Sequence, residues 1–245
     1  PARLRHRERA VTADDYRTLA RETPGVAVGR VELLPRFKPQ QRQGDIPGIV
    51  TVMALPARPL APAPNPRADR PFLEAVYAWL EPRRPLGVEL YVIGCEYVPV
   101  GLTVAVTVGE GAAPETTLQA VKDALTRVLW PLAGGGFDGT GWPLGRALSN
   151  RELAVEVARV AGVAEVAGLN LFKKNLDSGV WVRVDDSTNG REQNIPFERW
   201  QLPEILTVTA VDDDGATGAP LSIAAAMNPA ADRDAVAVPV VPDLC

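Results

Sequence analysis

The segment that most constrains this fold covers residues 81–108, where a helix-ending turn leads into a strictly alternating apolar run. Pro82, Pro85 and Gly87 end a helix and turn the chain, because proline cannot continue the helical hydrogen bonds and glycine accepts turn dihedral angles. From residue 100 to 108, valine or leucine alternates with glycine, threonine or alanine. This period of two predicts a β-strand with one apolar face. These are packing residues, so we interpret the segment as scaffold.

Residues 1–93 are predicted to form a first α+β lobe that opens on an arginine-rich segment. Thr12 caps a helix over residues 13–22, and Asp69 caps a second helix with apolar residues at helical spacing. Strands are predicted over residues 26–34, 49–55 and 88–93. The prolines between residues 56 and 66 form a stiff, extended connector. The order helix–strand–strand–helix–strand is that of a split β-α-β-like unit.

Residues 94–172 are predicted to form a second lobe of the same kind. Its expected elements are a strand up to residue 108, a helix with Pro114 near its first turn, a glycine-rich loop over 131–145, a helix from about residue 150 and a strand over 163–172. Ser149 and Glu152 have the spacing of a capping box. In that motif the serine hydroxyl binds a backbone amide of the first turn and the carboxylate binds back.

Residues 173–245 are predicted to be β-rich and irregular. Strands are expected over residues 180–184, 191–197 and 206–211. The first two flank Asn189-Gly190, the dipeptide that best supports a tight hairpin. From about Pro229 onward proline and alanine dominate, so we expect this tail to become ordered only against a neighbouring surface. The predicted fold class is therefore α+β, with two small split β-α-β-like lobes followed by an irregular β-rich C-terminal region.

The amino-acid composition limits the classes of function that this chain can have. The chain has 245 residues, 46% hydrophobic and 23% charged, which is ordinary for a globular protein that buries a core. The net charge of −4 argues against a nucleic-acid-binding surface covering the molecule, and we interpret the basic run Arg3–Arg9 as a solvated connector. No apolar run reaches the roughly 18 residues that a membrane-spanning helix needs. The start at Pro1 predicts that an N-terminal part is missing.

Several sequence patterns are similar to ligand-binding motifs, but a structural role explains each of them better. The glycine-rich stretch 134–141 follows a helix and has no lysine, whereas a phosphate-binding loop needs Gly-Lys-Ser/Thr after a strand. The acidic run from Asp185 matches the start of a calcium loop, but its twelfth position would be Pro196 instead of glutamate. His6 is the single histidine, and Asp212–Asp214 is interpreted as a solvated turn. We therefore predict no catalytic, cofactor-binding or metal-binding residues and no enzyme activity.

Aromatic residues in loops and short strands are the candidate interface residues, because exposed aromatic side chains often anchor protein contacts. We predict contacts with partner proteins at Trp142, Phe137, Trp181 and Trp200. For Trp142, core and interface remain alternatives. In either case we expect burial, against its own lobe or a neighbouring subunit, since the surrounding glycines allow a sharp approach of the backbone.

Four short motifs follow one another along the chain. They are RAVTADDY (9–16), PGIVTV (47–52), RRPLG with YVPV (83–87 and 97–100), and GWPLGR with VAGV (141–146 and 160–163). In this order and spacing they resemble the baseplate J-like proteins of contractile phage tails and related injection systems. The resemblance covers roughly residues 9–172, and the C-terminal part carries much less of it.

The resemblance implies a structural wedge component that needs no cofactor. Such a subunit would join wedges around the central spike and relay rearrangement to the sheath. The implied partners are other baseplate wedge proteins, a second J-like subunit, and sheath and spike or hub proteins, in a six-fold assembly without nucleic acid or a membrane span. The protein would be cytoplasmic during assembly and then part of a phage tail or an injection particle. The residues leave open which of the two.

Two other classes remain alternatives on the residues alone. Split β-α-β-like lobes also occur in ligand-binding and nucleic-acid-binding modules, although no basic sheet face or aromatic ladder is evident here. An unrecognised hydrolase built on carboxylates is the third class, and no pattern in the sequence points to it.

Overall fold

The structure is a computed structural model that describes residues 9–59, 65–175, 178–184, 192–213, 219–220, 222–223 and 236–239. The chain divides into two compact units, Pro1–Glu96 and Tyr97–Cys245. Helices and mixed sheets occur in both units, so the predicted α+β class is confirmed. Predictions that concern His6, the acidic run from Asp185 and the middle of the proline connector lie outside the described residues.

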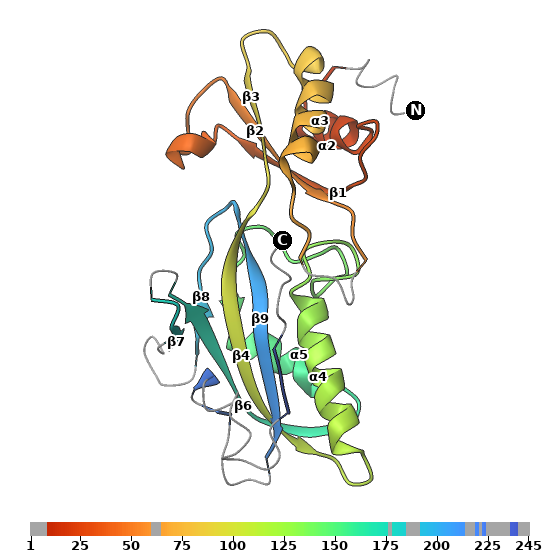
Figure 1. Cartoon of the computed structure of the whole chain (residues 1–245), viewed down its shortest axis with the longest axis vertical. Helices are drawn as coiled ribbons and strands as arrows, with labels where there is room; N and C mark the ends of the chain where they lie inside the picture. Colours follow the sequence, from red (N-terminus) through yellow and green to blue (C-terminus); the bar gives the residue numbers. More distant parts are fainter. Residues whose placement is uncertain are drawn as a thin grey trace. The chain divides into compact units, whose positions relative to one another are not determined.

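Unit 1 contains a three-stranded sheet covered by two helices (Figure 1). Its elements are α2 (Ala13–Arg21), β1 (Val28–Pro35), η1 (Pro39–Gln41), β2 (Ile49–Pro56), α3 (Arg70–Leu80), η2 (Glu81–Arg83) and β3 (Glu89–Ile93). Strand β2 pairs antiparallel with β1 and parallel with β3. Parallel neighbours need a crossover connection, which α3 supplies. The predicted order of elements in this lobe is confirmed.

The core of unit 1 lies between the helices and one face of its sheet. Tyr16 and Leu19 of α2 meet Val76 and Leu80 of α3 over the β2 residue Val52, and all five side chains are buried. The two helices begin at the residues that the sequence predicts. Each is capped by a side chain that accepts a hydrogen bond from a free backbone amide of the first turn.

Both predicted helix caps of unit 1 are confirmed. The Thr12 side chain accepts from the Asp15 amide at 3.2 Å, and the Asp15 carboxylate accepts from the Thr12 amide at 2.7 Å, which completes a capping box. The Asp69 carboxylate accepts from the Phe72 amide at 2.9 Å. Such bonds satisfy amides that have no partner within the helix.

Unit 2 is built on a five-stranded sheet in the order β10-β9-β4-β6-β7. Its elements are β4 (Glu96–Val108), α4 (Pro114–Val128), β5 (Leu148–Ser149), α5 (Asn150–Ala158), β6 (Val163–Lys174), β7 (Trp181–Arg183), β8 (Asn194–Ile195), β9 (Gln201–Asp212) and β10 (Val236–Pro239). Helix α4 packs along β9 and α5 along β6, so both helices cover the same side of the sheet (Figure 1). Strands β5 and β8 form a separate two-stranded ladder.

Strand β4 is buried on both faces, whereas its sequence predicts one apolar face. Val100, Leu102 and Val104 are completely buried, as the alternation predicts. The residues between them are buried as well: Thr103 and Ala105 have no exposed surface. The second face carries small residues because the segment that contains Pro220 and Ile223 lies close over it.

Strands β7, β9 and β10, all after residue 173, belong to the same sheet as β4 and β6, which differs from the separate C-terminal region expected from the sequence. Strand β7 pairs with β6, and β9 lies between β10 and β4. Asn189-Gly190 lies outside the described residues. The strands on either side of it pair elsewhere in the described part: β7 pairs with β6, and β8 pairs with β5. The tight turn occurs earlier: the Asn175 amide donates to the Val180 carbonyl at 2.9 Å, and Gly179 has a φ of 71°.

The predicted capping box at Ser149 is also wrong. Ser149 pairs with Asn194 in the β5–β8 ladder and its side chain makes no capping bond. The Glu152 carboxylate instead accepts from Arg146 at 2.7 Å. Arg146, which lies outside the four-residue motif, therefore binds the carboxylate that the motif assigns to the helix end.

Of the tail expected from about Pro229 onward, residues 236–239 lie in the described part, and its ordering against a neighbour stays a prediction. Strand β10 pairs antiparallel with β9, with Val236 opposite Ala210. Ala219, Pro220 and Ile223 contact the sheet itself. None of the described helices is long and apolar enough to cross a membrane.

We expect Thr12→Ala and Asp69→Ala each to lower the free energy of unfolding by about 1 kcal/mol, because each removes an acceptor from a helix N-terminus. Ser149→Ala should change it by less than about 0.5 kcal/mol, since the hydroxyl caps nothing. Urea unfolding of the three variants beside the parent measures the difference. A loss at Ser149 equal to that at Thr12 would contradict the assignment of the helix ends.

Tyr16→Phe is expected to stabilise unit 1 by about 1 kcal/mol, because the buried hydroxyl has no hydrogen-bond partner. Burial also raises the pKa of Tyr16 above its ordinary value of 10.0, against a smaller opposing effect of Arg84. The unfolded chain therefore ionises first as the pH rises past about 10, and the parent should lose stability there. Urea unfolding at neutral and alkaline pH tests both effects. Tyr77→Phe, at a half-exposed position, is the control, and an equal response of the two variants would refute this account.

Candidate interface residues around the glycine-rich loop

The glycine-rich loop between α4 and β5 is folded tightly against the end of α4. A Cβ atom on Gly135 would lie 2.3 Å from the Trp130 carbonyl oxygen, and one on Gly141 would lie 2.5 Å from the Pro131 carbonyl oxygen. Gly141 also has a φ of 100°, which side chains disfavour. Only glycine therefore fits at these two positions.

The backbone amides of this loop are already hydrogen-bonded within the loop and to α4. The Gly134 amide donates to the Gly139 carbonyl and the Gly141 amide to the Gly135 carbonyl, both at 2.8 Å. The Gly136 amide donates to the Val128 carbonyl at 3.0 Å. A phosphate cradle needs such amides to point at its ligand, so these amides do not form one. The loop is a structural crossover, as its sequence predicts.

Trp142 closes the loop and is fully buried, which confirms the prediction of burial. Its backbone amide donates to the Trp130 carbonyl at 2.9 Å, and its indole N–H donates to the Arg146 carbonyl at 3.3 Å. Its own unit supplies the burial. Trp142 thus has the role of an anchor for the loop in the single chain.

Phe137 and Arg146 form a half-exposed cluster above Trp142. The ring centroids of Phe137 and Trp142 are 5.5 Å apart, and the Arg146 guanidinium carbon lies 4.9 Å from the Phe137 ring and 5.5 Å from the Trp142 ring. The side chains of Arg146 and Glu152 are 39% and 43% exposed. Cation–π contacts and a charge-assisted hydrogen bond hold these groups in place. The cluster presents an aromatic ring and two charged groups at the surface.

Trp181 and Trp200 are half-buried at other places of unit 2. Trp181 lies on β7 with the Lys174 ammonium 5.9 Å from its ring. Trp200 is in the turn before β9, and that turn lies against Gly145, whose amide donates to the Gln201 carbonyl at 3.1 Å. The structure therefore brings Phe137 and Trp142 together and places Trp181 on a different element. Contact of these residues with partners stays a prediction.

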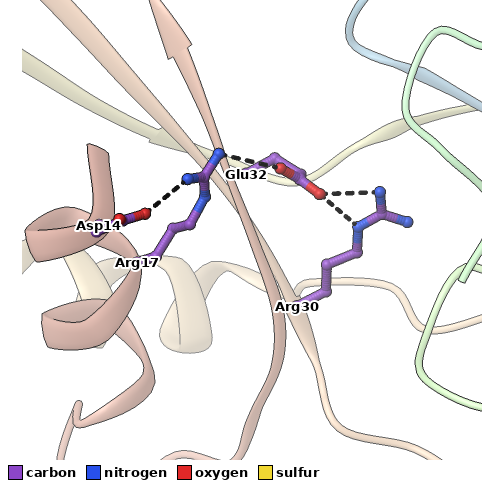
Figure 2. A network of polar contacts seen from close by, with 4 residues as sticks. All are labelled: Asp14, Arg17, Arg30 and Glu32. Carbon is purple, nitrogen blue, oxygen red and sulfur yellow. Dashed lines mark hydrogen bonds and ion pairs between the residues drawn. The ribbon is translucent and has the colours of Figure 1, made fainter. Parts of the chain in front are cut away.

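Unit 1 contains a network of charged side chains (Figure 2). The sequence patterns did not reveal it. Arg17 of α2 lies 3.0 Å from Asp14 and 3.9 Å from Glu32 of β1. The Glu32 carboxylate also accepts two bonds from Arg30, at 2.9 and 3.1 Å. The network links a helix to an edge strand. Alternating charges along β1 were its only signal in the sequence.

The acidic end of β9 has a structural role. The Asp212 carboxylate accepts from the Val108 amide at 3.2 Å, and the Asp213 amide donates to the Val106 carbonyl at 2.8 Å. Asp213 is 4% exposed, so the expectation of a solvated turn is wrong for this residue. Within the described part of the chain, no three histidine, cysteine, aspartate or glutamate side chains gather as a metal site would require.

Comparison with known proteins gives a likeness in fold. No family model matches the chain, and no curated protein matches it. Among solved structures, a chain of the anti-feeding prophage (AFP) baseplate, determined by cryo-EM with 6-fold symmetrisation, is similar with a TM-score of 0.52 and 16% sequence identity. The match covers 83% of this chain and 39% of that chain, so this chain spans well under half of its length. At such low identity the likeness concerns the fold.

We expect Trp142→Ala to lower the free energy of unfolding of unit 2 by about 3–5 kcal/mol, because it empties the centre of the loop. Phe137→Ala, which removes a half-exposed ring from the same cluster, should have less than half of that effect. Thermal and urea unfolding monitored on unit 2 measure both. A neutral Trp142→Ala variant would show that the loop holds its shape without the indole.

Proposed function

We propose that this chain is a structural component of the baseplate of a contractile injection system or phage tail, and not an enzyme. The carrying observation is the likeness in fold to a baseplate chain of the anti-feeding prophage over 83% of this chain. Four sequence motifs over residues 9–172 independently resemble baseplate J-like proteins. The two lines use different information, because one compares backbone geometry and the other compares residue identity.

The motif residues serve the fold, which supports a scaffold role. In the first motif, Thr12 and Asp15 close a capping box and Tyr16 is buried. In the last, Trp142 is buried and Arg146 binds Glu152. These residues define a helix end and a loop.

We assign the chain more specifically to a J-like wedge subunit. On this proposal it joins wedges around the central spike, contacts a second J-like subunit and the sheath and hub proteins, and is assembled in the cytoplasm into a six-fold particle. The mechanism is repacking of interfaces between two states, with unit 1 and unit 2 moving as bodies. The half-exposed Phe137–Arg146 cluster and the partly exposed Trp181 and Trp200 are the proposed contact residues.

The other two classes draw no support from a specific observation in the described residues. The chain is acidic overall, with a net charge of −4, which disfavours a nucleic-acid-binding module. Carboxylates of the described part, such as Asp15, Glu32 and Asp212, bind amides or arginines within the fold. We therefore propose no hydrolase.

Purification of sheathed particles from cells that carry this gene tests the proposal. Mass spectrometry should find the chain in the particle fraction, and deletion of its gene should remove assembled particles while complementation restores them. A Phe137→Ala/Trp200→Ala variant should fold yet lower the particle yield about tenfold or more, as loss of interface anchors does. Normal particles from the deletion strain, or a chain absent from particles, would refute the baseplate role.

A further inference from the structure

The loop between β1 and β2, residues 36–46, is a folded element that extends beyond the ends of these strands (Figure 1). Its two ends are joined by the Ile46 amide, which donates to the Arg36 carbonyl at 3.0 Å. Nearer its tip, the Lys38 amide donates to the Gln43 carbonyl at 2.8 Å, and these two residues form a β-bridge around η1. Main-chain hydrogen bonds therefore fix the shape of the β1–β2 loop.

One buried side chain fastens the β1–β2 loop to the sheet. Phe37 is 1% exposed, and the buried Thr51 hydroxyl of β2 donates to the Phe37 carbonyl at 2.5 Å. The exposed side chains of the loop are all polar, and they belong to Arg36, Gln40, Gln41, Arg42, Gln43 and Asp45. The loop thus has a fixed base and a polar outer surface.

The backbone of the β1–β2 loop is strained at three positions. Arg36, Arg42 and Asp45 have φ values of 61°, 49° and 63°. Every non-glycine residue with a positive φ in the described part of the chain lies in this loop. The left-handed conformation costs free energy for a residue that carries a side chain, and glycine avoids this cost. Strained residues of this kind cluster at sites that bind something.

The contacts of the two arginines within the fold return less than the strain costs. The Arg36 guanidinium donates to the Asp45 carbonyl at 3.2 Å in an exposed position. Arg42 lies 3.0 Å from the Glu96 carboxylate, and these side chains are 67% and 37% exposed. Exposed ion pairs contribute little to stability, less than a left-handed arginine costs. The two side chains are therefore better explained by a contact outside the chain.

We propose that the β1–β2 loop docks on an acidic protein surface, whose carboxylates bind Arg36, Lys38 and Arg42. This inference rests on the proposed baseplate role and names the chemistry of one neighbouring subunit. A guanidinium binds a carboxylate through two parallel N–H donors, and a lysine adds a point charge. Because the loop is already fixed, binding costs less conformational entropy than ordering a flexible loop would.

The loop suits a protein better than a nucleic acid. Asp45 lies in the loop and Glu96 beside it, where a nucleic-acid backbone offers only anionic phosphates. A protein surface can also offer hydrogen-bond donors to these two carboxylates. The aromatic ring of Phe37 is buried, so it does not stack on a base.

An Arg36→Asn/Arg42→Asn variant separates docking from folding, because asparagine tolerates the left-handed conformation and carries no charge. We expect its urea midpoint to equal or exceed that of the parent, and the yield of sheathed particles to fall about tenfold or more. Arg21→Asn/Arg58→Asn removes the same charge at exposed positions elsewhere in unit 1 and is the matched control, with the parental yield.

Two results with this pair of variants would overturn the docking surface. A parental particle yield from Arg36→Asn/Arg42→Asn would show that assembly does not use the loop. A lower urea midpoint together with a lower yield would assign the two arginines to the fold. Mobility-shift electrophoresis with single-stranded and duplex DNA covers the other class of partner. DNA binding by the parent that this variant loses would also refute an acidic protein partner.

Carbodiimide cross-linking of purified particles locates the partner, because this reagent joins a lysine amine directly to a carboxylate in contact with it. Mass spectrometry should find Lys38 joined to an aspartate or glutamate of another subunit. If the chain is present in particles but Lys38 is joined to its own chain alone, or to nothing, the docking surface is refuted and the baseplate role stands. A chain absent from particles refutes both.

Discussion

The burial of β4 on both faces is the constraint on which the second unit depends. One row of its side chains, Val100, Leu102 and Val104, is sealed on the helix side, and each such burial contributes roughly 1.5–3 kcal/mol. The opposite row is small because the tail segment passes directly above it. The Thr103 hydroxyl donates a hydrogen bond to the Pro220 carbonyl, so this buried polar side chain also has a partner. A larger residue in the small row would lift the tail from the sheet.

Close packing also determines the shape of the glycine-rich loop. Gly135 and Gly141 leave no room for a side chain, and the loop bends sharply enough to place Trp142 against its own backbone. The loop resembles a ligand-binding loop in composition but uses its amides internally. Arg146 then bridges the loop to α5 through Glu152, which positions the Phe137 edge at the surface. The position of the Phe137 ring at the surface therefore depends on the packing of the loop interior.

Local patterns predicted the structure where the deciding contacts are local. The Thr12 and Asp69 caps follow from residues three positions apart, and the split β-α-β order of unit 1 follows from element lengths and turns. Local patterns were insufficient where a residue outside the pattern competes. Glu152, the predicted partner of Ser149, binds Arg146, and the strands on either side of the undescribed Asn189-Gly190 segment pair with β6 and β5.

The candidate interface residues also differ in how far their neighbours lie along the sequence. Burial of Trp142 could be predicted because glycines crowd around it, but its burial by its own unit could not. The neighbours of Trp181 are invisible in the sequence, since Gly101 lies 80 positions earlier and Ile223 lies 42 positions later. Contacts of that range require the strand order β4-β6-β7, which depends on a turn at Gly179 that resembles any short polar loop.

We propose that this chain is a building block of a baseplate, and cryo-EM of the sheathed particle from its source tests this role most directly. The account predicts density at the baseplate, repeated around the six-fold axis, into which unit 1 and unit 2 each fit as a rigid body with the Phe137–Arg146 cluster at a contact between subunits. A baseplate map that is fully explained by other chains, with no density that either unit fits, would contradict it.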